Sequence, residues 1–163
     1  MNKLTRLRAL AAGAVAATVV SADQLSKSLV QPVLEKGDIH VLGPLDLELS
    51  YNPGVAFGVG KGLSPALVAA GVLIVVAVVG FTTSLQSRLT TVAAGLIAGG
   101  AVSNLADRLG RGHSGAVIDW INLSHWPTFN VADSCIVIGV GLLVLANLLT
   151  GRPTAADPAP SGR

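Results

Sequence analysis

Four apolar segments of helical length constrain this chain of 163 residues more than any other feature. They cover about residues 10–30, 63–82, 90–106 and 131–149. An α-helix needs about 20 apolar residues to cross the hydrocarbon of a bilayer. Charged residues make up only 12% of the sequence, whereas soluble domains contain about 25%. The pattern therefore predicts a mainly α-helical membrane protein with four transmembrane helices.

The first apolar segment follows a basic N-terminus and ends in polar residues. The basic start, the apolar run and the small residues at 20–22 also fit a cleavable secretory signal peptide, and this alternative stays open. The segment nevertheless continues in a helix-compatible sequence, in which Asp23 and Lys27 lie one turn apart and can pair. We therefore interpret it as an uncleaved first helix with polar groups at its outer end.

A small sheet is predicted at about residues 37–60, between the first two helices. Apolar and polar residues alternate from Leu45 to Tyr51, which is the period of a half-buried strand. A turn is predicted at 52–54, and 55–59 is expected to return as a second strand. Because an open strand pair leaves backbone groups without partners in hydrocarbon, we expect the sheet outside the bilayer.

Four helices would place both termini on the same side of the membrane. The basic N-terminal residues dominate the orientation of such a protein and favour the cytoplasm. Eight of the nine acidic residues, all except Asp157, then fall on the opposite side. We therefore predict cytoplasmic termini and a sheet at the outer face. The basic residues at the N-terminus are Lys3, Arg6 and Arg8.

Residues 1–150 are predicted to form a single membrane-embedded domain, because the chain is too short for two sizeable domains. Residues 151–163 are rich in proline and polar residues, which predicts a disordered cytoplasmic tail. The protein is expected to act as a monomer.

Two glycines lie inside the third apolar segment. Gly95 and Gly99 have the spacing that lets membrane helices approach closely. The motif is weak, because glycine and alanine are plentiful in this chain. It predicts tight packing of the third helix against a neighbour.

The segment 112–128 lies between the third and fourth apolar segments and is interpreted as an outer loop. It contains Gly112, Gly115, Trp120 and Trp126, and the two tryptophans suit a membrane interface. We hypothesise that this loop acts as a lid.

Two aspartates, Asp119 and Asp133, stand among apolar neighbours in a chain with few charges. Burying a carboxylate is costly, and an ionisable residue at a membrane boundary suggests a functional site. The alternative is that one caps a helix and the other is a solvated loop residue. The predicted topology brings further polar residues to the same outer level, which favours a catalytic pair. They are Asp23, Lys27, Asn52, Asn104, Arg108 and Asn130.

Paired carboxylates can hydrolyse a peptide bond. Two that lie close together cannot both ionise, so one keeps its proton and the other loses it. The ionised member can take a proton from water while the neutral member donates one to the scissile carbonyl. Which of Asp119 and Asp133 carries the proton stays open, because a coupled pair titrates as a unit.

Other chemistries have less support in the sequence. No serine has a histidine and an acid in evident support. Cys135 is the only cysteine and lies in an apolar run, and the three histidines lack metal-ligand spacing. The formal net charge of +2 is too small to suggest nucleic acid. We therefore expect neither a metal nor a cofactor, and no nucleic-acid partner.

Five motifs follow one another along these segments. They are Asp23-Gln24-Leu25-Ser26-Lys27, Asn52-Pro53-Gly54-Val55-Ala56-Phe57-Gly58, Gly99-Gly100-Ala101-Val102-Ser103-Asn104-Leu105-Ala106-Asp107-Arg108, Val117-Ile118-Asp119-Trp120 and Phe129-Asn130-Val131-Ala132-Asp133. Together they resemble the ordered motifs of the bacterial lipoprotein signal peptidases, or signal peptidase II. The chain departs from that pattern at Ser103, where glycine is usual, and at Trp120, where phenylalanine is usual. We expect Ser103 to alter close helix packing near Asn104.

The resemblance implies an aspartic endopeptidase of the bacterial cytoplasmic membrane. Such enzymes remove the signal peptide of diacylglyceryl-modified prolipoproteins by cleaving before the lipidated cysteine, and globomycin blocks their site. By the resemblance, Asp119 and Asp133 would be catalytic, and membrane lipid would surround the site. The lining or supporting residues would be Asp23, Lys27, Asn52, Gly54, Asn104, Arg108 and Asn130.

Two other functions stay open from the residues alone. A proton-coupled transporter would place polar residues at mid-membrane depth, and the second and third apolar segments contain none. A non-enzymatic membrane assembly factor would use its aspartates only as caps or ion pairs.

Overall fold

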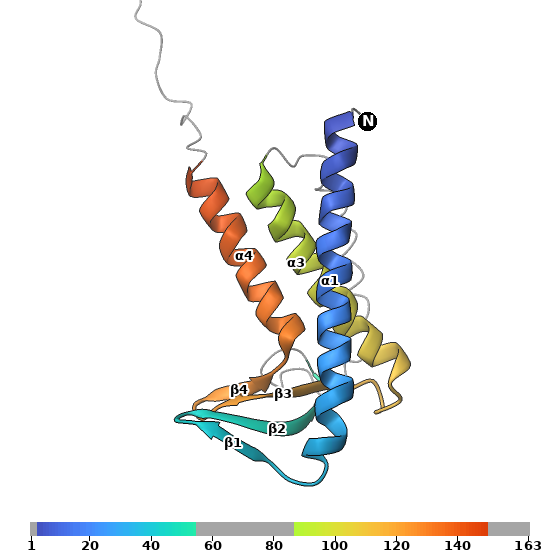
Figure 1. The fold of residues 1–163 in the computed structure, drawn as a ribbon, viewed down its shortest axis with the longest axis vertical. Coiled ribbons are helices and arrows are strands. Elements are labelled where there is room, and N and C mark those ends of the chain that lie inside the picture. The colour runs from blue at the N-terminus through green and yellow to red at the C-terminus, as the bar shows by residue number, and fades with distance from the viewer. Residues whose placement is uncertain (1–2, 55–86, 150–163) are drawn as a thin grey trace, which may run out of the picture.

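The computed structural model describes residues 3–54 and 87–149. Three helices stand beside one another, and a four-stranded sheet lies across their end away from the N-terminus (Figure 1). The helices are α1 (Lys3–Leu34), α3 (Arg88–Gly110) and α4 (Val131–Leu149). The strands are β1 (Ile39–Leu42), β2 (Leu45–Asn52), β3 (Val117–Leu123) and β4 (Trp126–Phe129).

All three described helices are long and apolar enough to cross a bilayer. This confirms the prediction of a mainly helical membrane protein with a small sheet. Helix α1 contains 32 residues and extends past the predicted 10–30 at both ends. The predicted span at 63–82, the predicted strand at 55–59 and the tail at 151–163 lie outside the described residues.

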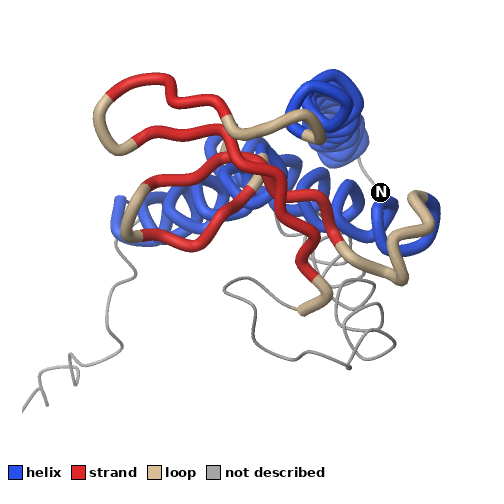
Figure 2. The backbone as a smooth tube through the Cα atoms, turned by 90° about the horizontal axis from the view of Figure 1, so that it is seen from below, coloured by secondary structure: helices blue, strands red, loops and turns tan. Residues whose placement is uncertain are grey.

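The sheet is antiparallel, with the strand order β1-β2-β3-β4 (Figure 2). The alternating segment predicted as a strand is β2, which confirms that part of the prediction. It pairs with β3 so that Ser50 is opposite Asp119 and Asn52 is opposite Val117. This register brings the end of β2 beside one of the two candidate aspartates.

Half of the sheet comes from the segment predicted to be a loop. Strands β3 and β4 occupy most of residues 117–129, so the interpretation of this segment as a loop, and the prediction of a sheet confined to the chain between the first two helices, were wrong. The action of this segment as a lid stays a prediction. β3 is rich in β-branched and aromatic residues, which favour a strand once a partner is available. That partner is β2, about 70 residues earlier in the chain. Gly112 and Gly115 adopt positive φ angles of 75° and 78° in the turn that leads into β3.

Glycines allow the helices to approach one another closely, as predicted for Gly95 and Gly99. A Cβ atom at Gly95 would lie 2.6 Å from Val15 Cβ, and one at Gly99 would lie 2.8 Å from the carbonyl oxygen of Ala16. Both neighbours belong to α1. On the other side of α3, a Cβ at Gly100 would lie 2.5 Å from the carbonyl oxygen of Ala132 in α4. Helix α3 therefore packs tightly against both neighbours.

We expect Gly99→Ala to destabilise the protein by about 1–3 kcal/mol, because the added methyl group meets α1 backbone that cannot rotate away. Gly13→Ala is the matched control: a Cβ there has nothing within 4 Å. The control should be neutral or slightly stabilising, since alanine favours helix over glycine. Thermal unfolding in detergent measures both effects. Equal melting temperatures for the two variants would contradict the close helix contact.

Candidate active site

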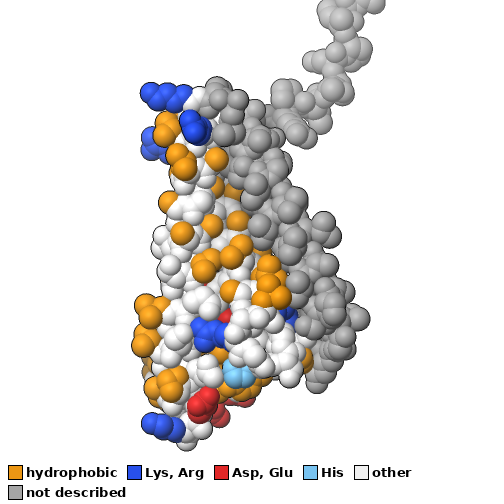
Figure 3. All heavy atoms as spheres, turned by 90° about the vertical axis from the view of Figure 1, so that its right-hand side faces the viewer, with side chains coloured by type: hydrophobic (Ala, Val, Ile, Leu, Met, Phe, Trp, Pro, Cys, Tyr) orange, Lys and Arg blue, Asp and Glu red, His pale blue; other side chains and the backbone are white. Residues whose placement is uncertain are grey.

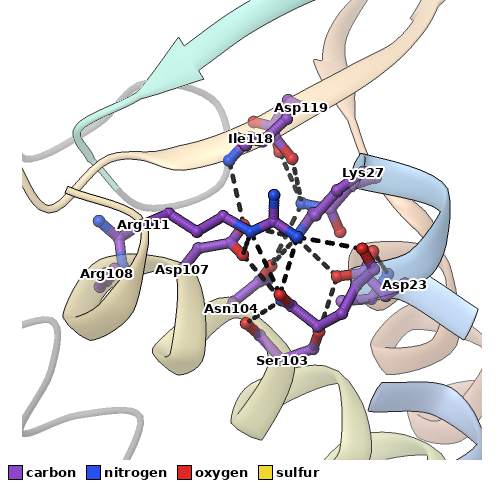
Figure 4. Close-up of polar contacts among 12 residues, drawn as sticks. Asp23, Lys27, Ser103, Asn104, Asp107, Arg108, Arg111, Ile118 and Asp119 are labelled. Atoms are coloured by element: carbon purple, nitrogen blue, oxygen red, sulfur yellow. Dashed lines mark hydrogen bonds and ion pairs between the residues drawn. The ribbon is translucent and has the colours of Figure 1, made fainter. Parts of the chain in front are cut away.

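The polar residues predicted to converge do meet, at the junction between the helices and the sheet. Figure 4 shows part of this set, from Asp23 and Lys27 on α1 to Asp119 on β3. The polar residues come from three helices and two strands, and the tertiary packing brings them together. Helix α1 supplies Asp23 and Lys27, α3 supplies Asn104 and Arg108, β2 ends at Asn52, β3 contains Asp119, and Asn130 and Asp133 begin α4.

Asp119 is a buried residue of β3 rather than a solvated loop residue. Its side chain is 2% exposed. One carboxylate oxygen accepts a hydrogen bond from Asn52 Nδ2 at 3.1 Å, and the other accepts one from Asn130 Nδ2 at 2.6 Å. The two amide donors fix the plane of the carboxylate, and they hold it between the end of β2 and the start of α4.

Asp133 lies in the first turn of α4 and forms a capping box with Asn130. The Asp133 amide donates to Asn130 Oδ1 at 2.9 Å, and the Asn130 amide donates to Asp133 Oδ2 at 3.3 Å. The other carboxylate oxygen of Asp133 accepts a hydrogen bond from Asn104 Nδ2 at 2.8 Å. The alternative that one aspartate caps a helix is therefore correct for Asp133, but the same carboxylate also faces the polar cluster.

Asn130 joins the two aspartates, which the sequence placed at one level without showing contact. It is fully buried. Its Nδ2 group contacts Asp119, and its Oδ1 atom accepts from the amide of Asp133. The Nδ2 group also lies 3.2 Å from Asn104 Oδ1. One side chain thus holds both aspartates in a common network.

Burial raises the pKa of the Asp119 carboxyl to about 7. The negative charge of Asp133 contributes to this raised pKa, because a second nearby carboxylate disfavours ionisation. The hydrogen bonds from Asn52 and Asn130 and the positive charge of Lys27 lower the same pKa. Near neutral pH, Asp119 is therefore close to its titration midpoint, as suits a group that must both hold and release a proton.

Arg108 and Gly54 contact each other beside this pair. The Arg108 guanidinium donates to the carbonyl of Gly54 and, at 2.8 Å, to the carbonyl of Gly115. The Gly54 amide donates to Asn52 Oδ1 at 2.9 Å, which leaves the Nδ2 of Asn52 directed at Asp119. Arg108 therefore holds the backbone at the end of β2 and ahead of β3, rather than pairing with either aspartate.

A second set of buried polar residues was missed by the sequence analysis. Asp107 is fully buried and lies 2.7 Å from Lys27 Nζ and 3.2 Å from Arg111 Nε. Gln24 Nε2 donates to Asp107 Oδ1 at 2.7 Å. The available signal was helical spacing: Asp107 lies one turn after Ser103 and one turn before Arg111, on a helix that packs beside Asp23 and Lys27.

Ser103 contributes a hydrogen bond where we had expected a change in packing. It is fully buried, and its hydroxyl donates to Asp23 Oδ2 at 2.7 Å. Gln24 Nε2 donates to the Ser103 hydroxyl at 3.0 Å. The residue that departs from the usual glycine therefore links α3 to α1 through its side chain.

Within residues 3–54 and 87–149, no group of three or more His, Cys, Asp or Glu residues is placed to hold a metal ion. Asp23 and Asp107 instead face the Lys27 ammonium.

Comparisons with known proteins agree with this geometry. The family described as Signal peptidase (SPase) II matches residues 15–149. The chain belongs to the signal peptidase II family. The lipoprotein signal peptidase of Rhodococcus jostii is 36% identical over 155 residues, covering 92% of this chain and 78% of that protein. The one from Syntrophomonas wolfei is 40% identical over 137 residues, covering 82% and 90%.

Two solved structures share this fold. A bacterial membrane enzyme solved by the in meso method has a TM-score of 0.79 and 27% identity, covering 90% of this chain and 93% of that chain. A second has a TM-score of 0.74 and 28% identity, covering 84% and 92%. Family membership confirms the resemblance drawn from the five motifs, and it makes the protein an aspartic protease.

Proposed function

We propose that this enzyme removes signal peptides from diacylglyceryl-modified prolipoproteins, with Asp119 and Asp133 as the catalytic pair. It would cleave before the lipidated cysteine. The observation that carries the proposal is the contact of both aspartates with Asn130, through the buried carboxylate of Asp119 and the part-buried backbone amide of Asp133, in a chain whose relatives are lipoprotein signal peptidases.

The reaction follows from one proton shared by the pair. The ionised carboxylate takes a proton from a water, and the water oxygen attacks the scissile carbonyl carbon. The protonated carboxyl donates to the carbonyl oxygen, which gives a neutral tetrahedral diol. The C–N bond then breaks as the protonated carboxyl gives its proton to the leaving nitrogen and the ionised carboxylate takes a proton from a diol hydroxyl, so the pair returns to its singly protonated form. The raised pKa of Asp119 supports this scheme, because it keeps a proton in the pair near neutral pH.

The proposed orientation puts the site at the outer boundary of the bacterial inner membrane. Basic side chains gather at the end of the molecule opposite the sheet (Figure 3). They include Lys3, Arg6 and Arg8 at the start of α1, and positive residues favour the cytoplasmic side. With the further span proposed at 63–82, both termini are cytoplasmic. A lipid-anchored substrate can then reach the pair sideways from the bilayer, and a monomer suffices.

Several neighbours are proposed to line or support the substrate site. Asn52 and Asn104 contact the catalytic carboxylates, and Arg108 holds the adjacent backbone at Gly54. A substrate backbone or a cyclic peptide such as globomycin would lie against these groups. We therefore expect globomycin to compete with the lipidated precursor.

The test uses the purified full chain in detergent with two precursors that differ only in the diacylglyceryl group. We expect cleavage of the lipidated precursor, with product masses that place the cut before the modified cysteine, and no cleavage of the unmodified one. Globomycin should inhibit the reaction. If neither precursor is cut by folded enzyme, the proposal fails and a non-enzymatic membrane role gains support.

The activity is expected to fall as the pH rises through about 7. Above that pH the Asp119 carboxyl loses the proton that the pair must share. The fall in kcat on the basic side of the pH profile is called the basic limb. In Asn52→Ala, the basic limb should move to higher pH, because the lost hydrogen bond had lowered the pKa of Asp119. Asn122→Ala is the matched control, since Asn122 contacts Glu48 elsewhere on the sheet. Values of kcat across the pH range decide, and a limb at the same pH in all three enzymes would contradict the assignment.

A further inference from the structure

Lys27 is a fully buried lysine whose contacts the proposed reaction does not use. Its ammonium nitrogen lies 2.6 Å from Asp23 Oδ2, 2.7 Å from Asp107 Oδ2 and 3.3 Å from Asn104 Oδ1. An ammonium group has three N–H donors, so each donor has one partner. The three partners lie in α1 and α3, which pack beside each other (Figure 4).

The two carboxylates that contact Lys27 each also hold a backbone amide. Asp23 Oδ1 accepts from the amide of Ala132 at 2.9 Å. Asp107 Oδ2 accepts from the amide of Ile118 at 3.1 Å. Both hydrogen bonds are buried. Ala132 immediately precedes Asp133 in the chain, and Ile118 immediately precedes Asp119.

We infer that Lys27, Asp23 and Asp107 form a clamp that sets the separation of Asp119 and Asp133 by holding the backbone just ahead of each. Lys27 is then a positioning residue, and this role rests on the proposed function of the aspartate pair. We call these three residues the Lys27 clamp.

A third contact of Lys27 orients an amide that touches the pair directly. Because Lys27 Nζ donates to Asn104 Oδ1, the Nδ2 group of Asn104 is left to donate to Asp133. If the Asn104 amide turned over, two donors would face each other at Lys27 and two acceptors at Asp133. The ammonium group therefore selects one of the two amide orientations.

Stability alone would not require this arrangement. Well-packed apolar side chains often replace a buried ion pair without loss of stability. Apolar side chains at these positions would not accept the amides of Ile118 and Ala132, and they would not orient Asn104. The charges are also balanced, because Arg111 lies beside Asp107 and supplies the second positive charge opposite the two carboxylates. The cluster therefore acts by holding the Ile118 and Ala132 amides and by orienting the Asn104 side chain, rather than through a net charge.

The test compares Lys27→Met, Lys27→Arg and the wild type as full chains in detergent. Lys27→Met removes the charge and all three donors. Lys27→Arg keeps the charge, but the planar guanidinium group does not reproduce the three diverging N–H donors of the ammonium group. Lys36→Met is the matched control, because Lys36 is exposed just beyond α1. We measure kcat, KM and the pH profile for the lipidated precursor, together with the melting temperature.

The wild-type and control enzymes should have the same kcat. Both Lys27 variants should lose about 100-fold in kcat, as expected when reacting groups are displaced by about 1 Å, while KM stays within about threefold. In Lys27→Met the basic limb of the pH profile should also move to higher pH. Lys27→Arg should leave the limb in place, since its charge remains.

The limb shift depends on the charges that surround Asp119. Asp133 faces it from α4, Arg108 from α3 and Lys27 from α1, while Asn52 on β2 is neutral. Only the Lys27 charge changes in Lys27→Met. The limb shift in Lys27→Met reports the Lys27 charge, whereas the loss of kcat at nearly unchanged KM in folded Lys27→Arg reports the position of the pair. A role in folding alone would lower the melting temperature and leave the kcat of the folded enzyme unchanged.

Either of two results would overturn the clamp: a wild-type kcat in folded Lys27→Met, or a wild-type kcat in folded Lys27→Arg. If Lys27→Met does not fold, Lys27→Arg decides by its kcat. Failure of the proposed function is distinguishable, because the wild-type enzyme itself would then leave the lipidated precursor uncut.

Discussion

Asparagine in place of either Asp119 or Asp133 is expected to lower kcat for the lipidated precursor by at least about 100-fold. The amide has nearly the same shape as the carboxylate, but it neither takes a proton from water nor donates one to a leaving group. Asp133→Asn keeps an oxygen that can accept from the amide of Asn130, so the capping box need not be lost. Asp119→Asn removes a carboxyl whose burial already disfavours its charge. Neither change should unfold the protein.

The matched control for both variants is Asp38→Asn, which makes the same substitution at an exposed residue between α1 and β1. It should cleave at the wild-type rate. Melting temperatures show that each variant is folded, and mass spectrometry of the precursor gives the cleavage rates. Normal processing by either folded site variant would remove that aspartate from the proposed pair. The double variant should be no slower than the slower single variant, because residues that act as a unit are not additive.

The sequence identified Asp119 and Asp133 because carboxylates among apolar neighbours are conspicuous in a chain with so few charges. The same local pattern did not identify their surroundings. The segment containing Asp119 was interpreted as a loop because it lies between two apolar segments and contains Gly112 and Gly115. Its strand pairs with β2, far away in the sequence. A pairing between distant segments leaves little trace in the local sequence.

The Lys27 clamp shows a second reason why part of the site was not predictable. The i, i+4 spacing of Asp23 and Lys27 predicted a pair within the first helix, at its outer end. The structure instead buries both side chains and adds Asp107 from α3. Close approach of α3 to α1 makes this possible. The glycine spacing of α3 predicted the close approach, but it did not predict which side chains of α3 would face α1. The identity of the partner therefore depended on the packing angle of two helices.

Asn130 is expected to be as important to the reaction as the aspartates it joins. Both Asn130→Ala and Asn130→Ser remove the Nδ2 donor to Asp119 and the contact with Asn104. We therefore expect each variant to lose about 100-fold in kcat, on the scale of a small displacement of reacting groups. The basic limb of the pH profile should move to higher pH in both, because the lost hydrogen bond had lowered the pKa of Asp119.

Stability should separate the two variants even though activity does not. Serine is a good N-cap and can still accept from the amide of Asp133, whereas alanine cannot. Asn130→Ala should therefore be less stable than Asn130→Ser by about 1 kcal/mol. Thermal unfolding and the cleavage rate, measured on the same preparations, distinguish the roles. If Asn130→Ser retained wild-type kcat while Asn130→Ala lost it, Asn130 would serve only as the cap of α4. The pairing of Asp119 with Asp133 would then have to rest on the contacts made by Asn104 and the Lys27 clamp.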